Sequence, residues 1–196
     1  MKKTFSVIII IFFLSSCGSL GTAKQFGTGV SISFDPRTVG MQIDDTIMQK
    51  NLVARLTLTE KKYFLSIGIE VLDGRIFLTG KVDKPEEKIK ITKLAWETKG
   101  VRSVKNAIQI KGLSSFKSTA KDIFITAQLR TAIILNKQIK SNNYTLETIN
   151  KNIYIFGIAN NEDEKKEIIN EANKIYDVID VIPSIYLVSE LSRNKT

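Results

Sequence analysis

The stretch Ile76-Phe77-Leu78-Thr79-Gly80 recurs as Ile153-Tyr154-Ile155-Phe156-Gly157, and this pair decides the fold. The two stretches lie 77 residues apart, and other positions keep the same offset without a gap. The pairs are Asp45 and Asp122, Leu52 and Leu129, Glu70 and Glu147, Glu87 and Glu164, Ile91 and Ile168, Ala95 and Ala172, Val101 and Val178, and Val104 and Val181. The sequence therefore predicts two copies of one small fold, each with its own core.

Each copy has the pattern helix, strand, strand, helix, strand. In the first copy, Asp44 or Asp45 can cap a helix whose apolar residues recur at helical spacing: Met48, Leu52, Val53 and Leu56. Alternation then predicts two strands that turn one face inward, with Ile67, Ile69 and Val71 before the turn and Ile76 and Leu78 after it. Asp73-Gly74 between them is a strong type I′ turn signal.

The second helix of the first copy begins with Asp83 as the predicted cap and Glu86 three residues later, and it ends at Gly100. The last strand covers residues 104–110. In the second copy the elements are predicted at residues 118–135, 144–148, 153–157, a helix begun by Asn161, and 181–187. Asn150-Lys151-Asn152 replaces the Asp-Gly turn and predicts a looser hairpin.

The N-terminus has the features of an export signal. Lys2 and Lys3 precede an apolar run over residues 5–14, which is about half the ~20 residues of a transmembrane helix. The run ends in Leu14-Ser15-Ser16-Cys17, which resembles the lipobox of bacterial lipoproteins. This resemblance implies that Cys17 is acylated, with palmitate as one chain, and that Gly18 directs the protein to the outer membrane. The alternative is that Cys17 is an incidental thiol in a cleaved signal peptide.

The repeated order of elements resembles the BON domain, an α+β module with two helices on one face of a three-stranded sheet. The two Ile-x-[Leu/Ile]-x-Gly stretches carry much of this resemblance. Residues 35–45, Asp-Pro-Arg-Thr-Val-Gly-Met-Gln-Ile-Asp-Asp, resemble the segment before the first module of dual-BON outer-membrane lipoproteins of the DolP type. We therefore expect a signal peptide (1–16), a lipidated tether (17–43), two BON-like modules (44–112 and 117–190) and a C-terminal tail (191–196).

Composition argues against catalysis. The chain has no histidine and one cysteine, so sites built on His ligands or on an internal disulfide are excluded. The carboxylate clusters Glu86-Glu87 and Glu162-Asp163-Glu164 lie in the first turn of predicted helices, where acidic groups complement the helix dipole. We expect no enzyme activity, no cofactor, no metal site and no small-molecule substrate.

Charge differs between the copies. The formal net charge is +9, and residues 45–111 hold 14 basic and 8 acidic side chains against 9 and 10 in residues 117–190. A basic first module suggests an anionic surface nearby, with a solvated charged face as the alternative. Export makes nucleic acid an unsuitable partner despite the high pI.

The first helix of the second copy has two apolar faces. Ile125, Leu129, Ala132 and Ile133 form the core stripe, and the opposite side carries Ile123, Phe124, Ala127, Thr131 and Ile134. Arg130 and Lys137 follow one edge, and Lys117 and Lys121 lie near the start. The equivalent first-copy positions include Lys50 and Thr57, which predicts a wetter face there. Such a helix either lies in a membrane interface or packs against the first module.

In dual-BON lipoproteins this helix engages anionic phospholipid, so the resemblance implies a lipid-binding site at Phe124, Ala127, Arg130, Thr131 and Ile134. The aromatic residue of that family is typically tryptophan, whereas Trp96, the only Trp here, lies in the other module, where it is predicted to pack, as is Tyr176.

The implied function is a non-catalytic, lipid-anchored periplasmic protein that binds phosphatidylglycerol or cardiolipin at the inner leaflet of the outer membrane and supports envelope integrity. The alternative is a protein-interaction adaptor for an outer-membrane assembly or peptidoglycan-associated machine.

Overall fold

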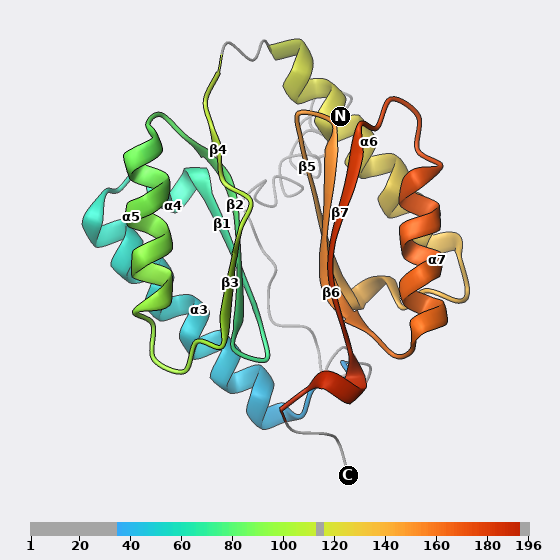
Figure 1. Ribbon diagram of the computed structural model, residues 1–196, viewed down its shortest axis with the longest axis horizontal. Helices are drawn as coiled ribbons and strands as arrows, with labels where there is room; N and C mark the ends of the chain where they lie inside the picture. The colour runs from blue at the N-terminus through green and yellow to red at the C-terminus, as the bar shows by residue number, and fades with distance from the viewer. Residues whose placement is uncertain (1–34, 113–115, 193–196) are drawn as a thin grey trace, which may run out of the picture. The chain divides into compact units, whose positions relative to one another are not determined.

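The structure, a computed structural model, describes residues 35–112 and 116–192 (Figure 1). The predicted signal peptide, the predicted lipidation site Cys17 and most of the predicted tether lie outside the described residues. The described residues form two modules with the predicted order of elements, and the predicted α+β fold class is confirmed.

The first module consists of two main helices, one short helix and a sheet. Along the chain these are α3 (Val39–Thr59), α4 (Tyr63–Ser66), β1 (Ile67–Leu72), β2 (Arg75–Val82), α5 (Pro85–Trp96), β3 (Ser103–Asn106) and β4 (Gln109–Ile110). β1 and β2 form an antiparallel hairpin, whereas β3 and β4 pair with β2 in parallel. Parallel pairing requires a crossover connection, which α5 provides.

The second module repeats this order. It contains α6 (Phe116–Leu135), the 3₁₀ turn η2 (Ser141–Asn143), β5 (Tyr144–Ile149), β6 (Asn152–Ala159), α7 (Glu162–Asn173), β7 (Asp180–Leu187) and the 3₁₀ turn η3 (Val188–Glu190). β5 pairs with β6 antiparallel, and β6 pairs with β7 in parallel. In each module, the two main helices pack on one face of the sheet.

The predicted inward residues are buried in each module. Leu52, Ile76, Leu78 and Ile91 belong to the first core, and their partners at the 77-residue offset, Leu129, Ile153, Ile155 and Ile168, belong to the second. The alternation predicted for the strands is therefore confirmed, because the residues in phase with Ile76 and Ile153 face the helices.

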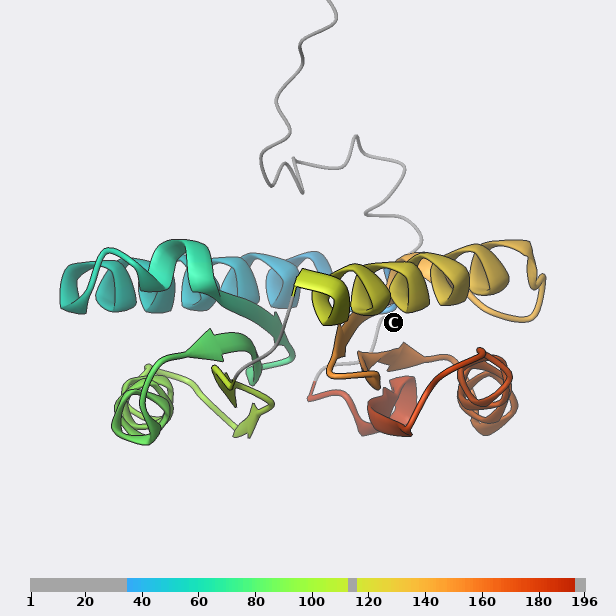
Figure 2. The same cartoon turned by 90° about the horizontal axis from the view of Figure 1, so that it is seen from above.

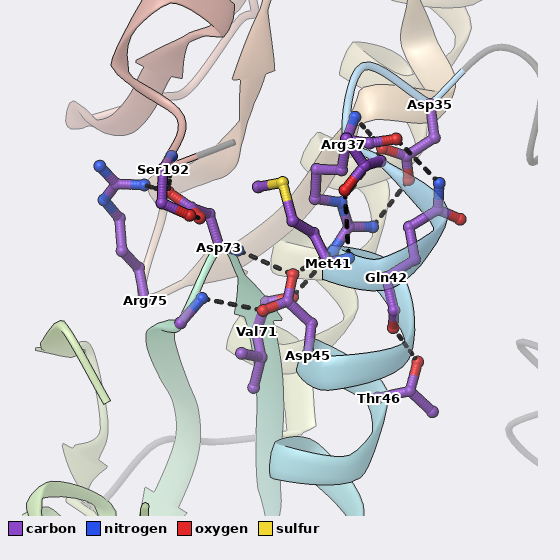
Figure 3. A network of polar contacts seen from close by, with 12 residues as sticks. Asp35, Arg37, Met41, Gln42, Asp45, Thr46, Val71, Asp73, Arg75 and Ser192 are labelled. Atoms are coloured by element: carbon purple, nitrogen blue, oxygen red, sulfur yellow. Dashed lines mark hydrogen bonds and ion pairs between the residues drawn. The ribbon is translucent and has the colours of Figure 1, made fainter. Parts of the chain in front are cut away.

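A buried carboxylate joins the first helix of each module to its hairpin. Asp45 Oδ2 and Oδ1 accept the backbone N–H groups of Asp73 and Gly74 at 2.7 and 2.8 Å (Figure 3). Arg37 Nη1 donates to the same Asp45 side chain at 2.7 Å. Burial raises the pKa of the Asp45 carboxyl, while the Gly74 N–H and the Arg37 guanidinium act in the opposite direction.

The second module repeats this contact with a different turn sequence. Asp122 accepts the N–H groups of Asn150 and Lys151 at 2.9 and 2.8 Å. Both turns have two residues with positive φ, Asp73 and Gly74 in the first and Asn150 and Lys151 in the second, as a type I′ turn requires. The prediction of a looser second hairpin is wrong, because two hydrogen bonds to a buried carboxylate hold even a lysine at φ 64°.

Two predicted helix starts are also wrong. α3 begins at Val39, and Thr38 caps it by accepting the Met41 N–H at 3.3 Å, so Asp44 and Asp45 lie inside the helix. α5 has Lys84, not Asp83, at its N-cap. Glu87 rather than Glu86 accepts the N–H groups of Asp83 and Lys84, at 2.8 and 2.9 Å.

The two modules share a third core between their sheets. Phe77, Ala107, Ile149, Tyr154 and Phe156 are buried together on the sheet faces that carry no helix. The rings of Phe77 and Phe156 stack with centroids 4.9 Å apart, and Gln109 Nε2 donates to Tyr154 Oη at 3.1 Å. The repeated stretches of β2 and β6 therefore serve two cores, with alternate residues in each.

The start of the predicted C-terminal tail lies on the first module. Leu191 is buried with Met41 and Ile158, and the Ser192 N–H donates to Asp73 Oδ2 at 3.1 Å (Figure 3). Arg75 donates to the Glu190 carbonyl oxygen at 3.1 Å and stacks over the Tyr186 ring. Residues from both ends of the described chain thus close one side of the interface.

Removing the Asp122 carboxylate tests the contact between helix and hairpin. Asp122→Ala leaves two N–H groups of the turn without their acceptor, so the free energy of unfolding should fall by about 2–4 kcal/mol. Asp122→Asn keeps one good acceptor, so its free energy of unfolding should fall less. Asp163→Ala removes an exposed carboxylate and should lower the free energy of unfolding by under about 1 kcal/mol. Urea unfolding of the four proteins measures this, and equal losses for Asp122→Ala and Asp163→Ala would contradict it.

The shared core predicts coupling between the modules. Phe77→Ala and Phe156→Ala should each lower the free energy of unfolding by about 3–5 kcal/mol, and the double variant should deviate from the sum by more than about 0.5 kcal/mol. Phe77→Ala with Leu129→Ala, a pair from different cores, is the matched control and should be closer to additive. Strict additivity for the Phe pair would mean that the modules are energetically independent.

Candidate lipid-contact surface

α6 separates a buried side from an apolar exposed side. Ile125, Leu129 and Ile133 are buried in the second core. Thr126 Oγ1 donates to Thr148 Oγ1 on β5 at 2.7 Å, which ties the helix to its sheet. This packing and the Asp122 contact fix the rotation of α6 about its axis. The side that points away from the core is therefore set by the module itself.

The residues predicted to bind lipid lie together on this exposed side. Phe124 is 64% exposed and Ile134 is 62% exposed, and Ala127, Arg130 and Thr131 are exposed between them. We call Ile123, Phe124, Ala127, Thr131 and Ile134 the α6 outer face. The Thr131 hydroxyl donates to the Ala127 carbonyl oxygen at 2.9 Å, so its polar group is satisfied within the helix. The face thus presents mainly methyl groups and one ring.

The cations beside this face differ in their surroundings. Arg130 and Lys137 are exposed, and within residues 35–112 and 116–192 no carboxylate forms an ion pair with either. Lys121 Nζ instead lies 3.1 Å from Asp177 Oδ2. Together with the nearer Lys151, Lys121 lowers the pKa of Asp177. Arg130 and Lys137 are therefore the cations of this edge that are available to an external anion. The side chain of Lys117 lies outside the described part of the structure.

One edge of the α6 outer face borders a groove beside the first module. The groove has a volume of about 590 Å³ and is lined by Ile123, Ala127 and Arg130 from α6 and by Ser66, Lys81 and Lys111 among the residues of the first module. Lys111 pairs with Asp83 at 2.9 Å. Phe124 and Ile134 remain exposed in the two-module unit. Contact between the modules, which uses the sheets, does not cover them.

The first module has an exposed apolar stripe as well. Val39, Ile43, Ile47 and Leu58 on α3 are exposed, and so are Phe64 and Leu65 on α4. The prediction of a wetter face on this helix compared only some of its exposed positions. Lys50 and Thr57 do lie where the second module has Ala127 and Ile134, but the apolar residues of α3 occupy neighbouring positions that the offset comparison left out.

Trp96 and Tyr176 do not pack as predicted, since both are exposed. The core side of the second helices is filled by smaller residues, Ile91 and Ala95 in α5 and Ile168 and Ala172 in α7. The aromatic rings lie at and beyond the ends of these helices and point to solvent. Aromatic character alone is a poor guide to burial when an alanine occupies the core position.

Sequence reasoning missed the residues that join the modules. Phe77, Tyr154 and Phe156 are the residues between the inward positions of the repeated stretches. A usable signal was present, because the run from Ile153 to Ile158 is apolar apart from Gly157, and a continuous apolar run indicates a strand buried on both faces.

The BON domain family model matches residues 44–112 and 123–187. The chain belongs to the BON domain family. The two matched ranges correspond to the two modules described above. The predicted similarity to dual-BON proteins of the DolP type is confirmed.

Two relatives and one solved structure illustrate the similarity. An uncharacterized protein from the gshII 5′ region of Anaplasma centrale is 34% identical over 125 residues, which cover 63% of this chain and 83% of that protein. Outer membrane lipoprotein DolP of Haemophilus influenzae is 26% identical over 163 residues, which cover 80% of this chain and 81% of DolP. The solved structure is that of CdsD, a structural protein of the type III secretion system of Chlamydia trachomatis, which is 15% identical in sequence. The superposition covers 73% of this chain and 63% of CdsD with a TM-score of 0.30, at which the likeness supports no conclusion.

The described residues contain neither a membrane-spanning helix nor a cluster of metal ligands. In residues 35–112 and 116–192 no helix is long and apolar enough to cross a bilayer. In the same residues no group of three or more Asp, Glu, Cys or His side chains is placed to hold a metal ion.

Substitutions at two neighbouring residues of α6 test whether its outer face contributes to the stability of the fold. Phe124→Ser should change the free energy of unfolding by less than about 0.5 kcal/mol because the ring is exposed. Ile125→Ser, one position along, buries a hydroxyl and opens a cavity, so it should cost at least about 3 kcal/mol. Chemical denaturation compares the two. A large loss for Phe124→Ser would mean that the ring packs against protein.

Proposed function

We propose that this protein is a non-catalytic, lipid-anchored periplasmic protein that binds anionic phospholipid at the inner leaflet of the outer membrane through the α6 outer face. The observation that carries the proposal is the exposed apolar row from Phe124 to Ile134 with Arg130 and Lys137 beside it. Exposed apolar patches of this kind mark contact with a membrane or a partner. The cations favour a surface that is both apolar and negative.

The energies of such a contact are adequate for reversible binding. Burying a large apolar side chain contributes roughly 1.5–3 kcal/mol, and each basic group near an anionic surface adds about 1 kcal/mol. Phe124 and Ile134 with two cations therefore support weak binding by themselves. Acyl chains on Cys17 would add ~0.8 kcal/mol per buried CH₂ group. They would keep the protein on the membrane for longer than α6 alone can.

The compartment is proposed from the lipobox and from the relative. Leu14-Ser15-Ser16-Cys17 is a lipidation signal, and the similar DolP protein is an outer membrane lipoprotein by name. In this proposal Cys17 holds the protein at the outer membrane, and the second BON module selects phosphatidylglycerol or cardiolipin by charge. Support of envelope integrity would follow from a protein that occupies anionic lipid in that leaflet.

Vesicle flotation of the unlipidated mature chain, residues 17–196 with Cys17→Ser, tests the proposal. Binding should increase when phosphatidylglycerol is added to phosphatidylcholine vesicles, and Phe124→Glu should reduce it by about tenfold or more, since the variant loses apolar burial and adds a repelled charge. Ile89→Glu, which changes an exposed apolar residue on α5 of the first module, is the matched control and should keep binding within about twofold. Equal binding to neutral and anionic vesicles would refute anionic selectivity.

The alternative adaptor role predicts a different result in cells. A photo-crosslinking residue at Thr131 or Ile134 should give lipid adducts and no dominant protein adduct if the α6 outer face meets the bilayer. One dominant protein adduct from both positions would instead identify this face as a docking site for an envelope machine.

A further inference from the structure

The exposed apolar side chains of this protein gather on one set of helices. Of the fifteen large apolar side chains that are exposed in the described residues, ten lie on α3, α4 or α6. They are Val39, Ile43, Ile47, Leu58, Phe64, Leu65, Ile123, Phe124, Ile134 and Leu135. The α6 outer face therefore holds only part of this exposed apolar surface, and the first module holds the rest.

Figure 2 shows α3, α4 and α6 in one layer that extends across both modules, and α5 and α7 in a second layer that also extends across both. Within each module, both main helices still pack on the same face of the sheet. The core residues of α3 and α6 point toward their sheets, so their exposed stripes point away from them on the side of this layer. A flat surface that approaches the α6 outer face would thus meet the first module on α3 and α4.

The most exposed apolar residues of the first module cluster where α3 meets α4. Leu58 and Leu65 are each 87% exposed and Phe64 is 60% exposed. We call these three residues, with Lys61 between them in the chain, the α3–α4 corner. Lys61 is exposed, whereas Lys62 is committed to ion pairs with Glu87 and Asp83. The corner therefore combines large apolar side chains with one cation directed to solvent.

Contacts of Tyr63 set which side chains of the corner face the core. Tyr63 is buried between them and donates its hydroxyl to Glu87 Oε1 at 3.2 Å. Burial raises the pKa of Tyr63 to about 12, so the phenol keeps its proton for this bond. The Tyr63 N–H donates to the Glu60 carbonyl oxygen at 3.0 Å and closes the turn. Phe64 and Leu65 are held outward by a residue that points inward.

The summed charges of the helices favour the same orientation. α5 and α7 together contain seven acidic residues against five lysines, whereas α6 contains three basic residues against one acidic residue. Anionic lipid would therefore attract the layer of α6 more than the layer of α7. The described chain begins at Asp35, 18 residues after Cys17, a segment that spans at most about 60 Å. Acyl chains on Cys17 therefore allow the layer of α3, α4 and α6 to lie against the membrane surface.

We propose that the α3–α4 corner is a second membrane contact, which inserts Leu58, Phe64 and Leu65 into the same anionic bilayer that α6 binds. This inference rests on the proposed function of α6 and extends it to the first module. The protein then lies flat on the bilayer on two apolar contacts, one from each module, that the shared sheet core holds at a fixed separation. Two linked contacts bind more tightly than either one alone.

Flotation with phosphatidylglycerol-containing vesicles tests the second contact in the same mature chain, residues 17–196 with Cys17→Ser. The double variant Phe64→Glu with Leu65→Glu should weaken vesicle partitioning by about tenfold or more, because two apolar insertions are lost. Ile89→Glu on α5 and Tyr176→Glu after α7 are matched controls, since both side chains are large and exposed and neither belongs to α3, α4 or α6. Each control should stay within about twofold.

The outcomes separate the inference from the proposed function. Wild-type partitioning of the Phe64 and Leu65 variant, with binding lost in Phe124→Glu, would overturn the inference and leave the α6 proposal intact. Retained binding in Phe124→Glu as well would overturn both. Equal losses in the Ile89 and Tyr176 controls would also overturn the inference, because added charge alone would then explain the effect.

A depth measurement keeps the test independent of the Glu variants. Single cysteines at Leu65, Phe124 and Ile89 in the Cys17→Ser chain carry an environment-sensitive fluorophore. Anionic vesicles should shift the emission to the blue at positions 65 and 124 and leave position 89 unchanged. A shift at 124 without one at 65 would overturn the second contact.

Discussion

Two carboxylates that face the turns of two hairpins hold each module in its shape. Asp45 and Asp122 lie inside their helices, and each accepts two turn N–H groups. In each module these two hydrogen bonds fix the position of the helix on the sheet. They also fix the rotation of the helix about its axis, because the carboxylate must point at the turn to reach both N–H groups. All outward faces follow from that rotation. The exposure of Phe124 is thus a consequence of Asp122, two residues earlier on the same helix.

The second constraint is a sheet that is apolar on both faces. One face packs against the helices and the other against the partner sheet, where Phe77 stacks on Phe156. Because the sheets supply the shared core between the modules, the outward faces of the helices are not used for it. A pair of BON modules joined helix to helix would bury the surfaces that are exposed here. This arrangement explains how a duplicated fold can stay compact and still present apolar helices to its surroundings.

Periodicity in the sequence was enough for the repeat, the order of elements, the core residues and the exposed row on α6, since each depends on local spacing. It was not enough for contacts between distant residues. Asp45 looked like a helix cap, and its true partner is a turn 28 residues later. Glu87 was passed over for Glu86 because the cap was placed at Asp83, although the 77-residue offset pairs Glu87 with Glu164. The apolar stripe of α3 was hidden by polar residues at the compared positions, and Phe77 by the assumption that a strand has one buried face.

The shared sheet core has a consequence for the order in which the chain folds. Until β6 and β7 are in place, Phe77, Ala107 and Leu72 lack their packing partners in the second module. The last described residues, Leu191 and Ser192, close onto the first hairpin only when the second module has formed. A first module that folds ahead of the second therefore exposes an apolar sheet face, and this intermediate is the stage of folding most prone to aggregation.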